Sequence, residues 1–358
     1  MKPAIREPVT QLAGSTRRDV LRILGGIAAA TLLADSRSAG QEPRGTPTRI
    51  DVHHHCFSQK LLGGFIDKLP NPQPMRDYTP ERSLEAMDRA GIATAFLSGP
   101  TVPDDAARVA RLMNDYAATL KADHRGRFGL FAVLPLPAVD ASLREIEYAL
   151  DTLKADGVSV LTSYDNHWLG EPMFQPVFDE LNRRHAVVFA HPTVAPCCQN
   201  LIPGARPESV EFNTDTSRAI WSLLNDVDFA TGATKPSMAT RYANITFIWS
   251  HAGGSLLGLI GRFLGNAASA ENLAKPPAPN SRLYHLRRFC YDTAGSANPI
   301  QMQALKTLVG TSQIVLGSDF PFVDSVNVVR NLQQCGFSAD ELRTIERESA
   351  LRVLVNWK

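Results

Sequence analysis

Short apolar runs alternate with longer amphipathic stretches along most of the chain, from Arg49 onward. The apolar runs are rich in Val, Ile and Phe, which is typical of parallel strands that are buried on both faces. Eight such runs predict strands at residues 49–53, 94–98, 128–134, 157–161, 186–190, 245–250, 289–292 and 314–317. Between them, apolar residues that share one helix face predict helices, among them residues 80–90, 104–123, 141–155, 173–184 and 216–229.

Strands and helices that alternate in this way predict an α/β fold with a parallel sheet. Eight such units favour a closed (β/α)₈ TIM barrel. The alternative is an open doubly wound sheet, but no G-x-G-x-x-G follows the first strand. A length of 358 residues would allow two domains. A barrel of this kind, however, takes about 250 residues or more in one domain, so we expect residues 41–358 to form a single barrel domain.

The first forty residues have the layout of an export signal. Arg17-Arg18 follows two hydroxyl residues and precedes an apolar run over residues 23–34. That run is well short of the roughly 20 residues that span a membrane, and small residues follow it at Ser38, Ala39 and Gly40. Paired arginines before a weakly apolar run predict a twin-arginine signal. We therefore expect residues 1–40 to be cleaved, which leaves an exported or periplasmic protein without a stable membrane anchor.

Composition narrows the function classes and the redox chemistry. The chain has 37 Lys and Arg against 36 Asp and Glu, a formal net charge of +1. No basic field is available for nucleic acid, and we expect no nucleic-acid partner. Five cysteines in this length do not make a disulfide framework. Cys197 and Cys198 are adjacent, and a disulfide between neighbouring residues is strained, so we expect two thiols there.

The strongest chemical signal is the segment Asp51–His55, which reads D-V-H-H-H. Side chains alternate between the two faces of a strand, so His53 and His55 are expected to point the same way and His54 the other way. Two imidazoles two residues apart at a strand end can bind one metal ion. A pair of buried, hydrogen-bonded histidines would be the structural alternative.

Three more residues of ligand type follow predicted strands. His191 and His251 come after the fifth and sixth strands, and Asp319 comes after the eighth. The carboxyl ends of barrel strands form the face on which active sites are built. Imidazole and carboxylate groups gathered at that face predict a metal site.

These motifs resemble the amidohydrolase superfamily. Within it the chain is similar to the metal-dependent decarboxylases related to aminocarboxymuconate-semialdehyde decarboxylase, over about residues 48–355. The matching pieces are D-V-H-H-H at 51–55, F-A-H-P-T at 189–193, W-S-H-A-G-G at 249–254, Y-D-T-A at 291–294 and G-S-D-F-P-F at 317–322. Further segments resemble 6-methylsalicylate decarboxylases, namely residues 146–149, 155–158, 164, 169–170 and 184–189.

The resemblance implies a ligand set and catalytic residues. One divalent ion, Zn²⁺ or Mn²⁺, would be bound by His53, His55, His191 and Asp319, and His251 and Asp319 would be catalytic. Residues 157–166 contain no lysine, whereas two-metal members of the superfamily carry a carboxylated lysine on that strand. This favours a mononuclear site at the C-terminal face of the barrel. Relatives also suggest a homodimer.

The activity implied is non-oxidative decarboxylation of a small hydroxybenzoate-like aromatic acid, with a proton delivered to the carbon that bears the carboxylate. Two alternatives remain at this point. One is a metal-dependent hydrolase of a lactone or another cyclic ester, and the other is a non-catalytic exported metal-binding protein.

Five further residues are candidates for contact with the substrate. Arg218 is expected near a helix start and could bind a carboxylate. Asp292 ends the seventh strand and could orient a ligand or the substrate, or cap the next helix. The loop after the fourth strand offers aromatic and imidazole groups that could line a pocket, namely Tyr164, His167 and Trp168.

Overall fold

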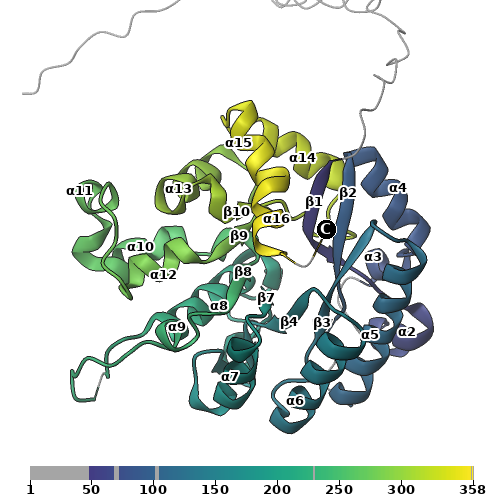
Figure 1. Ribbon diagram of the computed structural model, residues 1–358, viewed down its shortest axis with the longest axis horizontal. Helices are drawn as coiled ribbons and strands as arrows, with labels where there is room; N and C mark the ends of the chain where they lie inside the picture. The colour runs from purple at the N-terminus through teal and green to yellow at the C-terminus, as the bar shows by residue number, and fades with distance from the viewer. Residues whose placement is uncertain (1–47, 68–71, 101–104, 229, 356, 358) are drawn as a thin grey trace, which may run out of the picture. The chain divides into compact units, whose positions relative to one another are not determined.

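The computed structural model describes residues 48–67, 72–100, 105–228, 230–355 and 357 (Figure 1). The predicted export signal lies outside these residues. Eight parallel strands form one sheet in the order β1-β2-β3-β4-β7-β8-β9-β10. Their bounds are β1 Arg49–His55, β2 Ile92–Ser98, β3 Phe128–Val133, β4 Gly157–Leu161, β7 Val187–His191, β8 Thr246–Trp249, β9 Cys290–Asp292 and β10 Ile314–Val315.

Backbone hydrogen bonds between the first strand and the segment after the last strand bring the two edges of this sheet together. Val52 N–H donates to Leu316 O at 2.9 Å and His55 N–H donates to Phe320 O at 2.8 Å. In the other direction, Asp319 N–H donates to His53 O at 2.9 Å. The strand order and these bonds confirm the predicted (β/α)₈ barrel.

Helices connect the strands and surround them (Figure 1). Their bounds are α2 Gln59–Ile66, α3 Gln73–Arg76, α4 Pro80–Ala90, α5 Ala106–Asp123, α6 Val139–Glu147, α7 Gln175–Arg183, α8 Pro207–Leu224, α9 Met238–Arg241, α10 Leu256–Leu264, α11 Ala270–Leu273, α12 Arg282–Arg288, α13 Pro299–Val309, α14 Ser325–Gln333, α15 Ala339–Arg343 and α16 Ser349–Val353. A small hairpin of β5 (Ser163–Tyr164) and β6 (His167–Trp168) follows β4. None of the described helices is long and apolar enough to cross a membrane.

Local sequence signals explain why some helix bounds are predictable. The side chain of Thr79 accepts a hydrogen bond from Arg82 N–H, Pro80 occupies the first turn, and Gly91 ends α4 with a φ of 66°. A hydroxyl cap, an early proline and a left-handed glycine are strong helix boundaries. The predicted helix 80–90 is accordingly confirmed at both ends.

The prediction for α8 was wrong at both ends, since the helix covers Pro207–Leu224 and not residues 216–229. Most of its first two turns are solvent-exposed, so they carry no apolar periodicity from which the start could be read. Asn225 has an extended conformation and ends the helix.

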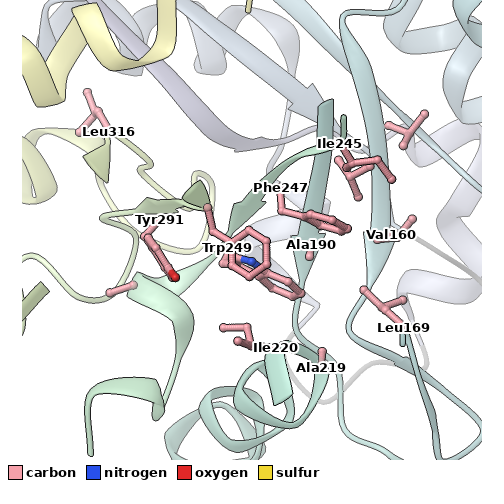
Figure 2. Close-up of a cluster of buried hydrophobic side chains, with 14 of the residues drawn as sticks. Val160, Leu169, Ala190, Ala219, Ile220, Ile245, Phe247, Trp249, Tyr291 and Leu316 are labelled. Carbon is pink, nitrogen blue, oxygen red and sulfur yellow. The ribbon is translucent and has the colours of Figure 1, made fainter. Parts of the chain in front are cut away.

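The core has two layers, inside and outside the barrel. The inner cluster takes alternate strand residues, Ile50, Val52, Phe96, Phe131, Phe189, Ile248, Cys290 and Val315, together with Ala350 and Val353 of α16 and Leu354 just after it. The outer layer lies between strands and helices, where Phe247 and Trp249 of β8 point toward Ala219 and Ile220 of α8 (Figure 2). The inner cluster fills the barrel interior up to the carboxyl ends of the strands, where polar residues lie.

Candidate metal centre

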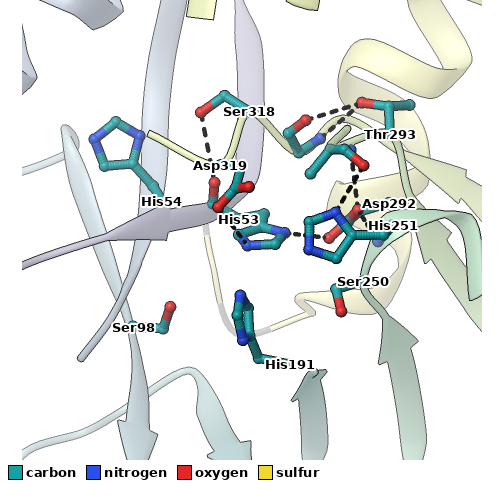
Figure 3. Close-up of polar contacts among 12 residues, drawn as sticks. His53, His54, Ser98, His191, Ser250, His251, Asp292, Thr293, Ser318 and Asp319 are labelled. Carbon is teal, nitrogen blue, oxygen red and sulfur yellow. Dashed lines mark hydrogen bonds and ion pairs between the residues drawn. The ribbon is translucent and has the colours of Figure 1, made fainter. Parts of the chain in front are cut away.

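β1 contains an irregularity that aims its histidines. Between Asp51 and His54 the first strand advances three residues while β2 advances two. A bulge of this kind adds one residue to a strand and re-aims the side chains beside it. As a result Val52 packs in the inner core, and the next residue, His53, also points into the barrel (Figure 3).

The buried carboxylate of Asp51 stabilises this bulge from the outer side of β1. Asp51 accepts hydrogen bonds from His53 N–H at 3.0 Å and from Ser318 N–H at 2.9 Å. Its other oxygen lies 3.0 Å from His54 Nδ1, and His54 Nε2 lies 2.7 Å from Ser83 Oγ of α4. His54 therefore points away from the barrel interior, as the strand alternation predicted, and it is fully buried.

Four groups of ligand type converge at the carboxyl ends of the strands. One atom each from His53, His55, His191 and Asp319 lies within 4.8 Å of the others, and Figure 3 shows three of these residues. The Nε2 atoms of His53 and His55 are 3.2 Å apart. Asp319 Oδ1 lies 3.3 Å from His53 Nε2 and 3.2 Å from His55 Nε2. Three imidazoles and one carboxylate at these separations suit a single divalent cation.

The opposite ring nitrogens of these histidines have partners that orient the rings. His53 Nδ1 lies 2.7 Å from Asp292 Oδ2, and His191 Nδ1 lies 2.9 Å from Pro192 O. A hydrogen bond at Nδ1 fixes the proton there and leaves Nε2 free to bind a metal ion, which is the usual arrangement around metal-binding histidines. The donor set and its supports thus fit a resident metal ion.

Asp292, a candidate for substrate contact, has both carboxylate oxygens in use within the protein. One oxygen faces His53, and the other accepts hydrogen bonds from His251 N–H at 2.8 Å and Ala294 N–H at 3.0 Å (Figure 3). The residue is fully buried at the end of β9. Of the alternatives open from the sequence, the structure therefore favours orientation of a ligand histidine over substrate binding.

Gly317 leaves the space that the His53–Asp292 pair occupies. A Cβ at this position would lie 2.8 Å from His53 Cβ and 2.9 Å from Asp292 Cβ. We expect Gly317→Ala to displace the pair and to weaken metal binding by about 10–100-fold, as loss of such supporting contacts does elsewhere. Metal retention against a chelator measures this. Gly64→Ala, where nothing lies within 4 Å, is the matched control, and equal retention in both variants would contradict the expectation.

His251 lies beside the ligand cluster without belonging to it. Its ring centre is 5.1 Å from that of His53 and 5.8 Å from that of His191. Because its Nδ1 lies 2.9 Å from Ala294 O, the proton resides there and Nε2 can accept another. His251 and Asp319 both have left-handed backbone angles, with φ of 53° and 65°. Non-glycine residues adopt this region at a cost of about 1–3 kcal/mol, and such strain is concentrated at functional sites.

The pKa shifts in the cluster favour the deprotonated side chains that bind metal ions at His55, His191 and Asp319. Burial lowers the pKa of His55 and holds that of His191 well below its usual value. Burial acts to raise the pKa of Asp319, but the charges and hydrogen bonds of neighbouring histidines hold it well below the usual range. For His53, burial is outweighed by Asp292 and Asp319, which raise the pKa to about 10.

Tyr164 is buried and is not one of the four groups that converge at the candidate metal centre. Its hydroxyl accepts a hydrogen bond from Leu161 N–H at 2.8 Å, and its ring packs against Phe174 in the outer core. This packing was not predictable from the sequence, because a buried tyrosine in a loop resembles a pocket tyrosine until its hydroxyl partner is known.

A conservative variant tests whether Tyr164 has a structural role or contacts the substrate. We expect Tyr164→Phe to lower the free energy of unfolding by about 1–3 kcal/mol, since it leaves the Leu161 N–H unpaired, without changing catalytic turnover. Denaturant unfolding measures the first effect. Tyr284→Phe, at a partly exposed tyrosine, is the control, and a large change in KM for Tyr164→Phe would instead indicate contact with the substrate.

The other three candidates lie on or beside the β5–β6 hairpin. His167 is exposed and pairs with Glu171 at 2.7 Å, which places it outside the metal cluster. Trp168 donates from Nε1 to Asp215 Oδ1 at 2.8 Å, and the guanidinium carbon of Arg218 lies 6.0 Å from the Trp168 ring centre.

The sequence did not reveal the role of two buried carboxylates, Asp51 and Asp215, which hydrogen-bond to the segments around the site. Asp215 binds the Trp168 indole and also accepts hydrogen bonds from Thr162 and Ser163. For Asp51 the available signal was a carboxylate between the apolar strand residues Ile50 and Val52, because buried charges require partners. Asp215 stands between Thr214 and Thr216, so the sequence offered no such signal there.

Comparison with known proteins identifies the family. Residues 50–354 match the family model described as amidohydrolase. The chain belongs to the amidohydrolase family. This match confirms the resemblance drawn from the sequence motifs.

The curated relatives include decarboxylases. The chain is 34% identical to decarboxylase yanB of Aspergillus niger over 85% of this chain and 87% of the relative. It is 33% identical to 6-methylsalicylic acid decarboxylase of Penicillium expansum, over 76% and 85% of the two chains. Among solved structures, dihydroxybenzoic acid decarboxylase from Polaromonas sp. JS666, which has bound manganese, has the same fold, with a TM-score of 0.73, 18% identity and coverage of 87% and 98%.

Proposed function

We propose that this protein is a metal-dependent, non-oxidative decarboxylase of a hydroxybenzoate-like aromatic acid related to 6-methylsalicylate. The observation that carries the proposal is the convergence of His53, His55, His191 and Asp319 within 4.8 Å. The decarboxylases among its relatives, at 33–34% identity over most of the chain, support this reaction in preference to ester hydrolysis.

The donor set is consistent with Zn²⁺ or Mn²⁺ as the resident ion, and we propose one ion per chain. Three imidazole nitrogens and one carboxylate oxygen suit either metal, and manganese is bound in the similar Polaromonas enzyme. When bound, the ion supplies positive charge that orients an ortho-hydroxy acid and stabilises its phenolate form. Elemental analysis of protein purified with each metal, followed by activity assays, distinguishes the two.

Asp319 and His251 are the residues suited to proton transfer. The neighbouring histidines keep the pKa of Asp319 low, so its side chain is ionised. The carboxylate is thus free to take the proton of the substrate hydroxyl and to return it to the ring carbon that bears the carboxylate. The bond from that carbon to the carboxylate then breaks, CO₂ leaves, and its electron pair restores the ring. His251, whose Nδ1 is held by Ala294 O, offers Nε2 as a second proton carrier beside the ring.

Metal content and CO₂ release, measured together, test the proposal. Residues 41–358 are purified with Zn²⁺ or Mn²⁺ and assayed against a panel of ortho-hydroxybenzoates. We expect about one ion per chain and release of CO₂ with a phenol, both lost in His53→Ala. Stoichiometric metal with ring-opened acid from a lactone, and no CO₂, would favour the hydrolase. A folded protein that binds no metal would contradict both enzymatic functions.

Export and assembly complete the proposal. We propose that residues 1–40 direct export by the twin-arginine route, on the basis of Arg17-Arg18 and the short apolar run after it. Fractionation of cells that express the full chain, compared with an Arg17→Lys/Arg18→Lys variant, tests this. We further propose a homodimer, which light scattering of the purified protein measures.

A further inference from the structure

The loop between β7 and α8 carries a pair of thiols that the proposed reaction does not use. Cys197 and Cys198 lie in a single 3₁₀ turn, Pro196–Cys198, that follows His191 on the same face of the barrel as the candidate metal centre. Their sulfur atoms are 2.7 Å apart, close enough for one thiol to hydrogen-bond the other. The side chain of Cys197 is exposed and that of Cys198 is buried.

We propose that Cys197 and Cys198 form a reversible dithiol–disulfide pair, a redox modification site on the rim of the barrel. The inference goes beyond the proposed decarboxylation and does not depend on it. The oxidant is a low-molecular-weight disulfide, which exchanges with protein thiols through a mixed disulfide.

Exposure decides which sulfur reacts first. The exposed Cys197 thiolate attacks the small disulfide, so a sulfur–sulfur bond forms to Cys197 and one small thiol leaves. Cys198 is buried, with 5% of its surface exposed, and lies against Cys197, so its sulfur attacks the mixed disulfide next. The vicinal disulfide forms, the second small thiol leaves and takes up the proton of Cys198. Two protein thiols are thereby oxidised and one small disulfide is reduced to two thiols.

Charge near the pair assists the second attack. The hydrogen bond between the two thiols and partial burial raise the pKa of Cys198, and the positive charge of Arg218 acts in the opposite direction. One nitrogen of that guanidinium, Nη1, is buried and has no hydrogen-bond partner among the described residues. A positive charge near a thiol stabilises its thiolate, which is the nucleophile in exchange.

Strain makes the product reversible. Neighbouring Cα atoms are about 3.8 Å apart across a trans peptide, whereas disulfides usually join Cα atoms about 4.4–6.8 Å apart. Strained and exposed disulfides are readily reduced and include the labile, regulatory ones. Strain therefore disfavours a permanent structural disulfide between these two cysteines, in agreement with the thiols expected from the sequence. A disulfide that forms here is readily reduced.

Mass spectrometry of the folded protein after exposure to oxidised glutathione tests the proposal. We expect the peptide that contains both cysteines to lose the mass of two hydrogen atoms and both sites to lose labelling by iodoacetamide. Dithiothreitol should restore both thiols. In Cys198→Ser and Cys198→Ala, Cys197 has no neighbouring thiol to displace glutathione, so we expect it to keep one glutathione.

The control is Cys335→Ser, which removes a buried thiol elsewhere in the fold and should behave as the unchanged protein does. A stable glutathione adduct on Cys197 in the unchanged protein would overturn the proposal. So would full iodoacetamide labelling of both cysteines after oxidation, or a disulfide between two chains. Circular dichroism before treatment shows that each variant is folded.

Discussion

Asp319→Asn is expected to lower kcat for CO₂ release by about 10³-fold or more, because general acid–base catalysis and metal charge each contribute effects of about this size. The substitution keeps an oxygen that can face the metal site but removes the proton acceptor. Asp319 is also one of the four converging ligand groups, so partial loss of metal is expected too. Product formation at saturating metal and substrate measures the catalytic effect.

Metal content separates the two contributions in this variant. Assays at increasing metal concentration show whether activity recovers when the site is filled. Asp340→Asn, at an exposed carboxylate that pairs with Arg343, is the control and should retain full activity. An Asp319→Asn enzyme within tenfold of the unchanged protein would rule out proton transfer by this residue.

Substitution of Asp292 is expected to have the second large effect, because Asp292 orients the candidate metal ligand His53. Asp292→Ala leaves His53 and two backbone N–H groups without their buried acceptor, and breaking a buried pair of this kind costs about 3–5 kcal/mol of folding stability. Asp292→Asn retains the volume and one acceptor oxygen. That oxygen stays with the two backbone N–H groups that require an acceptor, so the amide group faces His53. The histidine then loses the partner that fixes its proton on Nδ1, and we expect metal affinity to fall by about 10–100-fold.

Comparison of the two variants distinguishes a positioning role from a merely structural one. Asp292→Asn should unfold at a denaturant concentration nearer to that of the unchanged protein, yet bind metal as poorly as Asp292→Ala. Equilibrium metal titration and denaturant unfolding give the two quantities independently. If Asp292→Asn bound metal with unchanged affinity, orientation of His53 by Asp292 would be excluded.

Much of the fold was predictable because local composition matches the final environment of each strand. Strand β4 lies at the predicted residues 157–161, and the other predicted strands differ from the observed ones by two residues or fewer at each end. The helix α4 was predicted at residues 80–90 from apolar residues that share one face, and its cap, proline and glycine fix the same bounds in the structure. The start of α8 was missed because an exposed helical turn has no apolar pattern, and its partners lie far away in sequence.

The candidate site was predictable where a ligand follows an apolar strand. His191 and Asp319 needed no tertiary information beyond the polarity of parallel strands, whose carboxyl ends share one face. The roles of Tyr164 and Asp292 were not predictable, since each depends on a partner brought close by folding. Tyr164 meets a backbone N–H in its own turn, and Asp292 meets a histidine 239 residues away.

The sequence by itself predicted the barrel, because apolar strands are local patterns, and its motifs resembled the family that the comparison then identified. Through that resemblance it also named four candidate ligand groups, which the fold brings together. It also placed His53 and His55 on one face, since alternation along a strand is a local property. Only the tertiary structure decided which face that is. Ile50 and Val52 point into the barrel, so strict alternation from these residues would have turned both histidines outward. The bulge that Asp51 and Ser318 stabilise reverses this direction. That bulge depends on contacts between the first and last strands, which exist only after the barrel closes.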